Sequence, residues 1–214
     1  MKPKFTVILT TYNRKQLLLN ALNSLLKQTE KDWDAWIIDD GSTDGTESSL
    51  GKIISKDPRL HYFHQENQGE AAAKNKGIQL STGEFVTFLD SDDAYEKQHL
   101  QLRKEFLQNH PNTDFLHGGI QIIGNPYVVN REKKEELIHL SECVIGGTFF
   151  VRNKALKQLN GFRNLPFGCD ADLMQRAKQA NFIIAKIHAP TYIYNRNHPD
   201  SITHNYLKKL KTRN

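Results

Sequence analysis

The sequence predicts an α/β protein with a mostly parallel central sheet and helices on both faces. Three observations support this prediction: short apolar runs alternate with helix-like segments, those runs are apolar at almost every position, and polar clusters follow them. Strands of a parallel sheet show this pattern because both of their faces are covered. The length of 214 residues fits one domain.

The composition is that of a globular protein, with 38% hydrophobic and 25% charged residues. A disordered chain would be poorer in large apolar residues. The formal net charge of +5 is concentrated at one end, since residues 201–214 contain four basic residues and no acid. This distribution argues against a broad nucleic-acid-binding face. We interpret residues 204–214 as a basic tail, either frayed in solvent or in peripheral contact with anionic lipid.

The sequence shows no segment that targets or anchors the chain. Its apolar runs are too short to cross a bilayer, and its first residues lack the apolar stretch of a secretory signal. Cys143 and Cys169 are too few for a disulfide framework or a four-cysteine zinc site. We therefore expect a cytoplasmic protein, with or without peripheral contact at the inner face of the membrane, whose two thiols are free and at least partly buried.

Four strands alternate with three helices in the first half of the chain. We expect strands over 5–9, 33–38, 60–64 and 84–89, and helices with apolar stripes over 17–26, 50–54 and 71–80. Asn13 is the predicted cap of the first helix, and Thr43 or Asp44 that of the second. The third helix is expected to end at Thr82-Gly83.

The second half is less regular, which indicates that it forms a second substrate site. We expect helices over 100–107 and 169–180, and strands over 114–123, 146–151, 182–187 and 191–194. Acceptor specificity is expected to lie in residues 111–168. The charged segment 131–136 is predicted to be an exposed helix, with a mobile lid as the alternative.

Polar clusters follow three of the predicted strands, namely Thr10–Arg14, Asp39–Asp44 and Asp90–Asp93. Ligands of open parallel sheets bind beyond the carboxyl ends of the strands, so we expect the three clusters to line one crevice. The sequence has neither a Gly-rich phosphate loop with its lysine nor a G-x-G-x-x-G turn.

The cluster Asp90–Asp93 places three carboxylates within four residues. Neighbouring carboxylates repel one another unless a cation neutralises them, and hard oxygen ligands suit Mg²⁺ or Mn²⁺. The alternative is an ordinary turn or helix cap.

Taken together, these blocks resemble the family 2 glycosyltransferases of GT-A fold. The resemblance rests on Thr10–Arg14, Ile38–Asp44, Gly83–Asp93, Asn160–Arg163, Asp170–Arg176 and Arg196–Ile202, which occur in the family's order. It covers about residues 4–203 and implies a single GT-A domain over 1–203. Residues 1–94 would form its nucleotide-sugar-binding half and residues 95–203 its acceptor-binding half, followed by the basic tail.

The resemblance implies transfer of a monosaccharide from a UDP-sugar to a hydroxyl of a saccharide or lipid-linked acceptor, with inversion and with Mn²⁺ or Mg²⁺ as cofactor. Synthesis of cell-surface polysaccharide or glycoconjugate is the expected setting. One alternative is a non-catalytic nucleotide-sugar-binding homologue or partner subunit. Another is a nucleotidyltransferase, which would need a basic Gly-rich triphosphate loop that the sequence lacks.

The resemblance also implies roles in binding the nucleotide. Thr10 and Tyr12 would line the base and ribose pocket, and Asp40 would contact uracil, provided that Asp44 or Thr43 takes the capping role and leaves Asp40 free. Asp90 would reach the ribose or a metal-bound water, with Ser91 in the same nucleotide-binding block.

Further roles concern the metal and the diphosphate. Asp92 would coordinate the metal between the two phosphates, and His198 matches a histidine near the donor phosphates that is sometimes a metal ligand. Arg196 matches the nearby arginine. Lys74 would add positive charge near the diphosphate, or it is simply a solvated lysine on a helix.

Asp170 is the candidate general base, because it matches the second position of the family's Glu-Asp pair. Cys169 replaces the glutamate of that pair, a departure that would alter acceptor binding or the pKa of Asp170 without removing the base. Asp172 is the rival candidate, but with Arg176 four residues later it is expected to form a structural ion pair on the helix.

Overall fold

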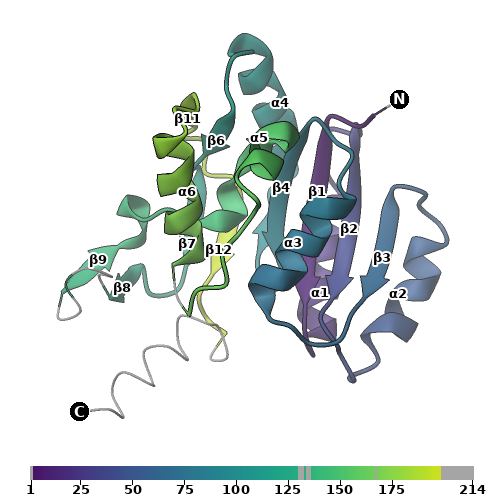
Figure 1. Ribbon diagram of the computed structural model, residues 1–214. Helices are drawn as coiled ribbons and strands as arrows, with labels where there is room; N and C mark the ends of the chain where they lie inside the picture. The colour runs from purple at the N-terminus through teal and green to yellow at the C-terminus, as the bar shows by residue number, and fades with distance from the viewer. Residues whose placement is uncertain (1, 130–132, 134–135, 167, 199–214) are drawn as a thin grey trace.

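A seven-stranded sheet runs through the centre of the computed structural model (Figure 1). The structure describes residues 2–129, 133, 136–166 and 168–198. The sheet contains β1 (Phe5–Thr11), β2 (Trp33–Asp39), β3 (Leu60–His64), β4 (Phe85–Asp90), β6 (Phe115–His117), β10 (Phe150–Arg152) and β11 (Ile184–Lys186). Their order is β11-β6-β10-β4-β1-β2-β3, and all neighbours are parallel except those of β10.

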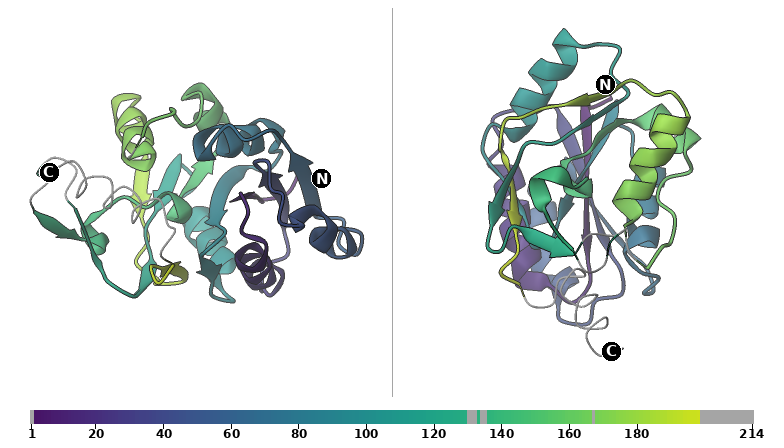
Figure 2. Two further views of the ribbon diagram at one scale, coloured as in Figure 1. Left: turned by 90° about the horizontal axis from the view of Figure 1, so that it is seen from below. Right: turned by 90° about the vertical axis from the view of Figure 1, so that its left-hand side faces the viewer.

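Helices cover both faces of this sheet, as Figure 2 shows from two further directions. One apolar core joins the sheet to α1 (Lys15–Leu26), α2 (Thr46–Ile54) and α4 (His99–Asn109). A second core on the opposite face joins it to α3 (Glu70–Leu80), α5 (Asn153–Gln158) and α6 (Cys169–Gln179). The predicted fold class, a mostly parallel sheet between two helical layers, is confirmed.

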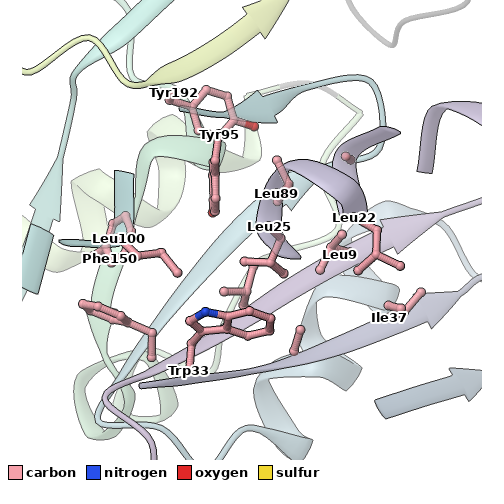
Figure 3. Packing of buried hydrophobic residues seen from close by; sticks show 14 of the residues in the cluster. Leu9, Leu22, Leu25, Trp33, Ile37, Leu89, Tyr95, Leu100, Phe150 and Tyr192 are labelled. Carbon is pink, nitrogen blue, oxygen red and sulfur yellow. The ribbon is translucent and has the colours of Figure 1, made fainter. Parts of the chain in front are cut away.

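Strand β1 explains why its sequence is apolar at nearly every position. Phe5, Val7 and Leu9 belong to the core on the α1 face, whereas Ile8 belongs to the core on the α3 face. Successive side chains of a strand point to opposite faces, so a strand buried on both faces loses the usual polar alternation. Figure 3 shows Leu9 packed among Leu22 of α1 and other buried side chains of the first cluster.

The predicted strands and helices of the first half are present, but one predicted cap is wrong. Asn13 does not cap α1, whose N-cap residue is Arg14 and whose first backbone N–H, that of Lys15, donates to Asp44 Oδ2 at 2.9 Å. Asn13 instead has a left-handed backbone (φ 51°), and its Oδ1 accepts from the backbone N–H of Thr43 at 2.7 Å. The N-cap residue of α2 is Gly45, and Asp44 just before it takes part of the expected role, because its Oδ1 accepts from the backbone N–H of Thr46 at 3.2 Å.

The predicted strand over 114–123 is partly wrong, because two strands occupy this range and are separated at Gly118-Gly119, where φ is 95° and 76°. Strand β6 stays in the main sheet, whereas β7 (Ile120–Ile123) joins a second sheet of order β5-β12-β7, with β5 (Ala94–Tyr95) and β12 (Tyr192–Asn195). A Cβ atom at residue 119 would lie 2.2 Å from the carbonyl oxygen of Ala189. Side-chain periodicity does not reveal such a change of sheet.

The predicted strand over 146–151 is also partly wrong. Residues Gly146–Thr148 form a 3₁₀ turn, η2, and only Phe150–Arg152 pair as a strand. Before this turn, β8 (Tyr127–Val129) and β9 (Leu137–His139) form a small hairpin, followed by the 3₁₀ turn η1 (Leu140–Glu142).

Some sequence predictions lie outside the described residues. They include the basic tail over 204–214 and four of the six residues of the charged segment 131–136. Both cysteines are partly buried free thiols, as expected. Among the helices of the described residues, none combines the length and the apolarity needed to cross a bilayer.

Leu9→Ala should lower the free energy of unfolding by about 2–5 kcal/mol, because Leu9 is fully buried and its neighbours cannot fill the cavity. Leu137→Ala is the control, since this leucine is 67% exposed and its truncation should cost less than about 0.5 kcal/mol. Urea denaturation measures both changes. Equal effects would contradict the described core.

Candidate active site

The carboxyl ends of β1, β2 and β4 meet at one edge of the main sheet, which we call the carboxyl edge. Thr10 pairs with Asp90 on one side and with Ile38 on the other. Beyond the strands, the backbone N–H of Asn13 donates to Ser42 Oγ at 2.8 Å. The prediction that the polar clusters after these strands come together is therefore confirmed.

Each of the three carboxylates in Asp90–Asp93 is held by a partner from a different part of the chain. Asp90 Oδ1 lies 3.1 Å from Lys74 Nζ of α3. Asp92 Oδ2 lies 3.1 Å from Arg14 Nη1, which follows β1. The buried Asp93 instead accepts hydrogen bonds from Tyr192 and Asn195 of β12. Lys74 and Arg14 thus offset part of the negative charge for which the sequence analysis expected a cation.

Lys74 is buried, with 5% of its surface exposed, so the alternative of a solvated lysine is wrong. Its Nζ lies 2.6 Å from Glu70 Oε1 as well as 3.1 Å from Asp90. Burial by itself lowers the pKa of Lys74, but the carboxylates of Asp90, Glu70 and Asp170 raise it well above its ordinary value. Lys74 is therefore a fixed positive charge among three acids.

The loop after β4 still holds an excess of negative charge. Burial and the charge of Asp90 raise the pKa of Asp92, although Arg14 and His198 act in the opposite direction. Burial, Asp90 and Asp92 raise the pKa of Asp93 well above its ordinary value. A cation bound next to Asp92 would relieve this repulsion.

Asp92 and His198 can act as ligands of a divalent ion. His198 lies close enough to Asp92 to lower the pKa of that carboxyl group. Within the described part of the chain, no group of three or more His, Cys, Asp or Glu side chains is arranged to hold a metal. A pair of side-chain ligands nevertheless fits Mg²⁺ or Mn²⁺, which commonly take their other ligands from water and substrate phosphates.

Asp40 is buried but not free, which corrects the expectation that capping by Asp44 would leave it without partners. Its Oδ1 accepts from Gln65 Nε2 at 2.7 Å and from the backbone N–H of Gln68 at 2.9 Å, and its Oδ2 accepts from the N–H of Gly69 at 2.8 Å. Asp40 therefore fixes the loop that leads into α3.

The other expected nucleotide-binding residues lie at or just beyond the carboxyl edge. Thr10 is partly buried near the end of β1, and Tyr12 follows that strand with half of its surface exposed. Ser91 is buried beside Asp90 at the end of β4. Their placement leaves Tyr12 as the most accessible of these side chains.

Asp170 lies in the first turn of α6 and is held by the turn η2. Its Oδ2 accepts from the backbone N–H of Gly146 at 2.9 Å, and a Cβ atom at residue 146 would lie only 2.4 Å from Oδ1. Burial raises the pKa of Asp170 to about 6, with Lys74 opposing this shift and Glu70 and Asp90 adding to it. A carboxylate with a pKa near 6 is well matched to proton abstraction close to neutral pH.

Asp172 has the structural role that the sequence predicted. Its Oδ2 lies 2.8 Å from Arg176 Nε, and the same guanidinium donates to the carbonyl oxygens of Leu159 and Gly161. Arg196, expected near the phosphates, is buried, and its Nη1 donates to backbone carbonyl groups of the segment entering β8.

Sequence reasoning missed several residues of the site. Glu70 had a local signal, because it stands four residues before Lys74 on one helix. Arg14 was part of a recognised block but had no assigned role. Gly146, Tyr192 and Asn195 reach the site through contacts between distant segments, which a single sequence does not reveal.

The chain matches the profile of glycosyl transferase family 2 over residues 6–181. It belongs to this family. An uncharacterized glycosyltransferase of Rickettsia felis is 42% identical over 120 residues, which are 56% of this chain and 20% of the relative. The GalNAc(5)-diNAcBac-PP-undecaprenol beta-1,3-glucosyltransferase of Campylobacter jejuni is 43% identical over 93 residues, 42% of this chain and 30% of the relative. The family 2 chain thus spans less than a third of the length of these two relatives.

Solved structures share the fold of this family 2 chain. TarS residues 1–349 of S. aureus, in complex with UDP-GlcNAc, superposes with a TM-score of 0.77 at 26% identity, covering 94% of this chain and 60% of that TarS fragment. The mannosyltransferase PcManGT of Pyrobaculum calidifontis, in complex with GDP-Man and Mn²⁺, gives a TM-score of 0.73 at 19% identity, with 96% and 60% covered. The latter likeness shows the fold alone, and the GT-A fold is confirmed.

Asp170→Asn should raise the melting temperature more at about pH 8 than at about pH 4.5. The folded-state pKa of Asp170 is raised from 3.8 to about 6, so the stability that this carboxyl contributes is present when it is protonated and is lost as the pH rises from 3.8 through about 6. Asparagine removes that cost and can still accept from the N–H of Gly146.

Asp172→Asn is the matched control on the same helix, and it should lower the melting temperature at about pH 8 because it weakens the ion pair with Arg176. Thermal denaturation at the two pH values measures both variants. A lower melting temperature for Asp170→Asn at the higher pH would contradict the raised pKa.

Proposed function

We propose that this family 2 chain is an inverting, metal-dependent glycosyltransferase that moves a monosaccharide from a UDP-sugar to an acceptor hydroxyl. The observation that carries the proposal is the environment of Asp170. Burial raises the pKa of this carboxylate to about 6, and its charge is coupled to Lys74 and to Asp90 at the carboxyl edge. This coupling supports a base close to the proposed donor site.

The nucleotide is proposed to bind along the carboxyl edge. Thr10 and Tyr12 would contact the base and ribose, with Ser91 and Asp90 at the end of the neighbouring strand. Asp40 would reach uracil from a fixed position, since its own hydrogen bonds hold the loop around it. The complex of TarS with UDP-GlcNAc supports a uridine nucleotide.

Lys74, Asp92 and His198 are proposed to serve the diphosphate. Asp92 and His198 would hold Mn²⁺ or Mg²⁺, and the complex of PcManGT with Mn²⁺ supports a divalent ion in this fold. When bound, such an ion acts as a Lewis acid that stabilises the charge of the departing diphosphate. Lys74 is already charged and buried beside Asp90, so it adds positive charge without further rearrangement.

Asp170 is proposed to accept the proton of the acceptor hydroxyl. As the O–H bond breaks, the acceptor oxygen attacks the anomeric carbon, and the bond from that carbon to the diphosphate oxygen breaks with its electron pair leaving on the nucleoside diphosphate. A single displacement inverts the anomeric centre. The N–H of Gly146 orients the carboxylate through a hydrogen bond of 2.9 Å.

The acceptor is proposed to be a saccharide or a lipid-linked saccharide. The name of the Campylobacter jejuni relative specifies an undecaprenol-linked acceptor, which supports this class and a role in cell-surface glycoconjugate synthesis at the inner face of the membrane. The acceptor half would be built from residues 95–203, which include β7 and β12 of the second sheet and the strands β8 and β9.

Calorimetry should show that UDP binds more tightly in Mn²⁺ than in EDTA. Asp92→Asn should weaken the Mn²⁺-dependent part about tenfold or more, because it removes a charged oxygen ligand. Glu136→Gln is the control, as this glutamate is exposed and paired only with Lys133 among the described contacts. Equal affinity of the unmodified protein in Mn²⁺ and in EDTA would rule out the metal-dependent mechanism.

Asp170→Asn should lower turnover by about 10²–10⁴-fold and change the affinity for UDP less than twofold, because the base contacts the acceptor and not the nucleotide. In the unmodified protein, kcat/KM should fall about tenfold per pH unit below about pH 6, where the base becomes protonated. The donor is first chosen from a panel of sugar nucleotides by thermal stabilisation.

Asp172→Asn is again the control, because it removes a carboxylate from the same helix, and it should retain turnover at temperatures where the variant is folded. Should the unmodified chain bind UDP but neither transfer nor hydrolyse any sugar nucleotide of the panel, the non-catalytic binding homologue is the correct function.

A further inference from the structure

Asp93 differs from its two neighbouring carboxylates because it has no basic partner in the described structure and no access to ligands. Only 5% of its surface is exposed. Its Oδ2 accepts from the hydroxyl of Tyr192 at 2.6 Å, and its Oδ1 accepts from the backbone N–H of Asn195 at 2.9 Å. Both donors belong to β12, so the carboxylate joins the loop after β4 to a strand that lies about a hundred residues later.

The hydrogen bonds continue from Asn195 to His198. Asn195 Nδ2 lies 3.1 Å from His198 Nε2, so the side-chain amide of Asn195 contacts the imidazole ring. Asn195 Oδ1 accepts from the N–H of Asn197 at 3.1 Å. One connected set of bonds therefore runs from the loop that carries Asp92 to the ring of His198.

Tyr192 is itself held in one place. It is fully buried, and the N–H of Asp90 points at its hydroxyl at 3.5 Å. A Cβ atom at residue 147 would lie 2.0 Å from the tyrosine oxygen, so only glycine at this position leaves room for the side chain. The hydroxyl group contacts both ends of the Asp90–Asp93 loop.

We propose that Asp93 is a positioning residue that, through Tyr192 and Asn195, fixes Asp92 relative to His198. This inference rests on the proposed function, in which those two residues hold the divalent ion. Asp93 does not contact the ion or the donor. It keeps the two ligands at a constant separation, although they belong to segments far apart in the sequence, so that the site does not have to be assembled when the donor arrives.

Tyr192→Phe tests this role by removing a single hydroxyl group. Tyr95→Phe is a matched control, because Tyr95 is also buried, pairs with Tyr192 across the second sheet and donates its hydroxyl to the carbonyl of Phe88 at 2.9 Å. Figure 3 shows the two tyrosines next to each other. Each hydroxyl donates one buried hydrogen bond and has one longer contact, to the N–H of Asp90 at 3.5 Å for Tyr192 and to Thr87 Oγ1 at 3.4 Å for Tyr95, so a merely structural role predicts equal behaviour.

Two measurements are made on both variants. Calorimetry should show that Tyr192→Phe weakens Mn²⁺-dependent UDP binding about tenfold while UDP binding in EDTA is unchanged, and that Tyr95→Phe binds as the unmodified protein does. Hydrogen exchange without ligands should be faster in the peptide covering 195–198 for Tyr192→Phe only, because the N–H of Asn195 loses its fixed acceptor.

Asp93→Asn is the conservative variant. Its amide can accept from the N–H of Asn195 and donate to the oxygen of Tyr192, so it should retain Mn²⁺-dependent affinity within about twofold, whereas Asp93→Ala should behave like Tyr192→Phe. Equal effects of Tyr192→Phe and Tyr95→Phe in both measurements, or equal losses in Asp93→Asn and Asp93→Ala, would overturn the proposal.

The binding of UDP by the unmodified protein tests the proposed function, and hydrogen exchange tests the positioning role independently of it. If the unmodified protein shows no Mn²⁺-dependent UDP binding, the metal-dependent function fails, and the exchange of residues 195–198 still decides whether Asp93 and Tyr192 position this segment. Unchanged exchange in Tyr192→Phe would then overturn the positioning role as well.

Discussion

The repulsion among the three carboxylates at the end of β4 is the constraint on which the rest of the site depends. No two of them have the same partner: Asp90 is paired with Lys74 and Asp92 with Arg14, whereas Asp93 accepts hydrogen bonds from β12. Those partners come from a helix, from the loop after the first strand and from the second sheet. The loop is therefore stable only when elements from both halves of the chain have assembled around it.

Incomplete compensation of negative charge also determines the properties of Asp170. Its pKa is raised because burial disfavours the carboxylate more than Lys74 stabilises it, and Glu70 and Asp90 add to the imbalance. A group that is kept partly uncompensated destabilises the fold at neutral pH, but it is also a better proton acceptor than an ordinary aspartate. Lys74 limits that cost, since without it Asp170, Glu70 and Asp90 would face one another as three uncompensated acids.

The sequence was sufficient where local rules apply and insufficient where distant segments meet. Short apolar runs located the first four strands, and the polar ends of three of them located the carboxyl edge. The sequence did not decide whether Lys74 is buried or solvated, because the exposure of a lysine on a helix depends on which segments pack over it. Asp40 was misjudged for a related reason: its hydrogen-bond donors lie in the loop 65–69, which carries no pattern of its own.

The turn at Gly146-Gly147 shows why one part of the predicted sheet is absent. A Cβ atom at residue 146 would meet Asp170, and one at residue 147 would meet the hydroxyl of Tyr192. The two glycines thus leave room, side by side, for the proposed base and for the tyrosine that holds the loop after β4. A strand in their place would alternate its side chains toward both faces of the sheet, and either side chain would displace one of these groups. The 3₁₀ turn is the backbone conformation that lets both approach, so the loss of regular pairing here follows from the geometry of the site.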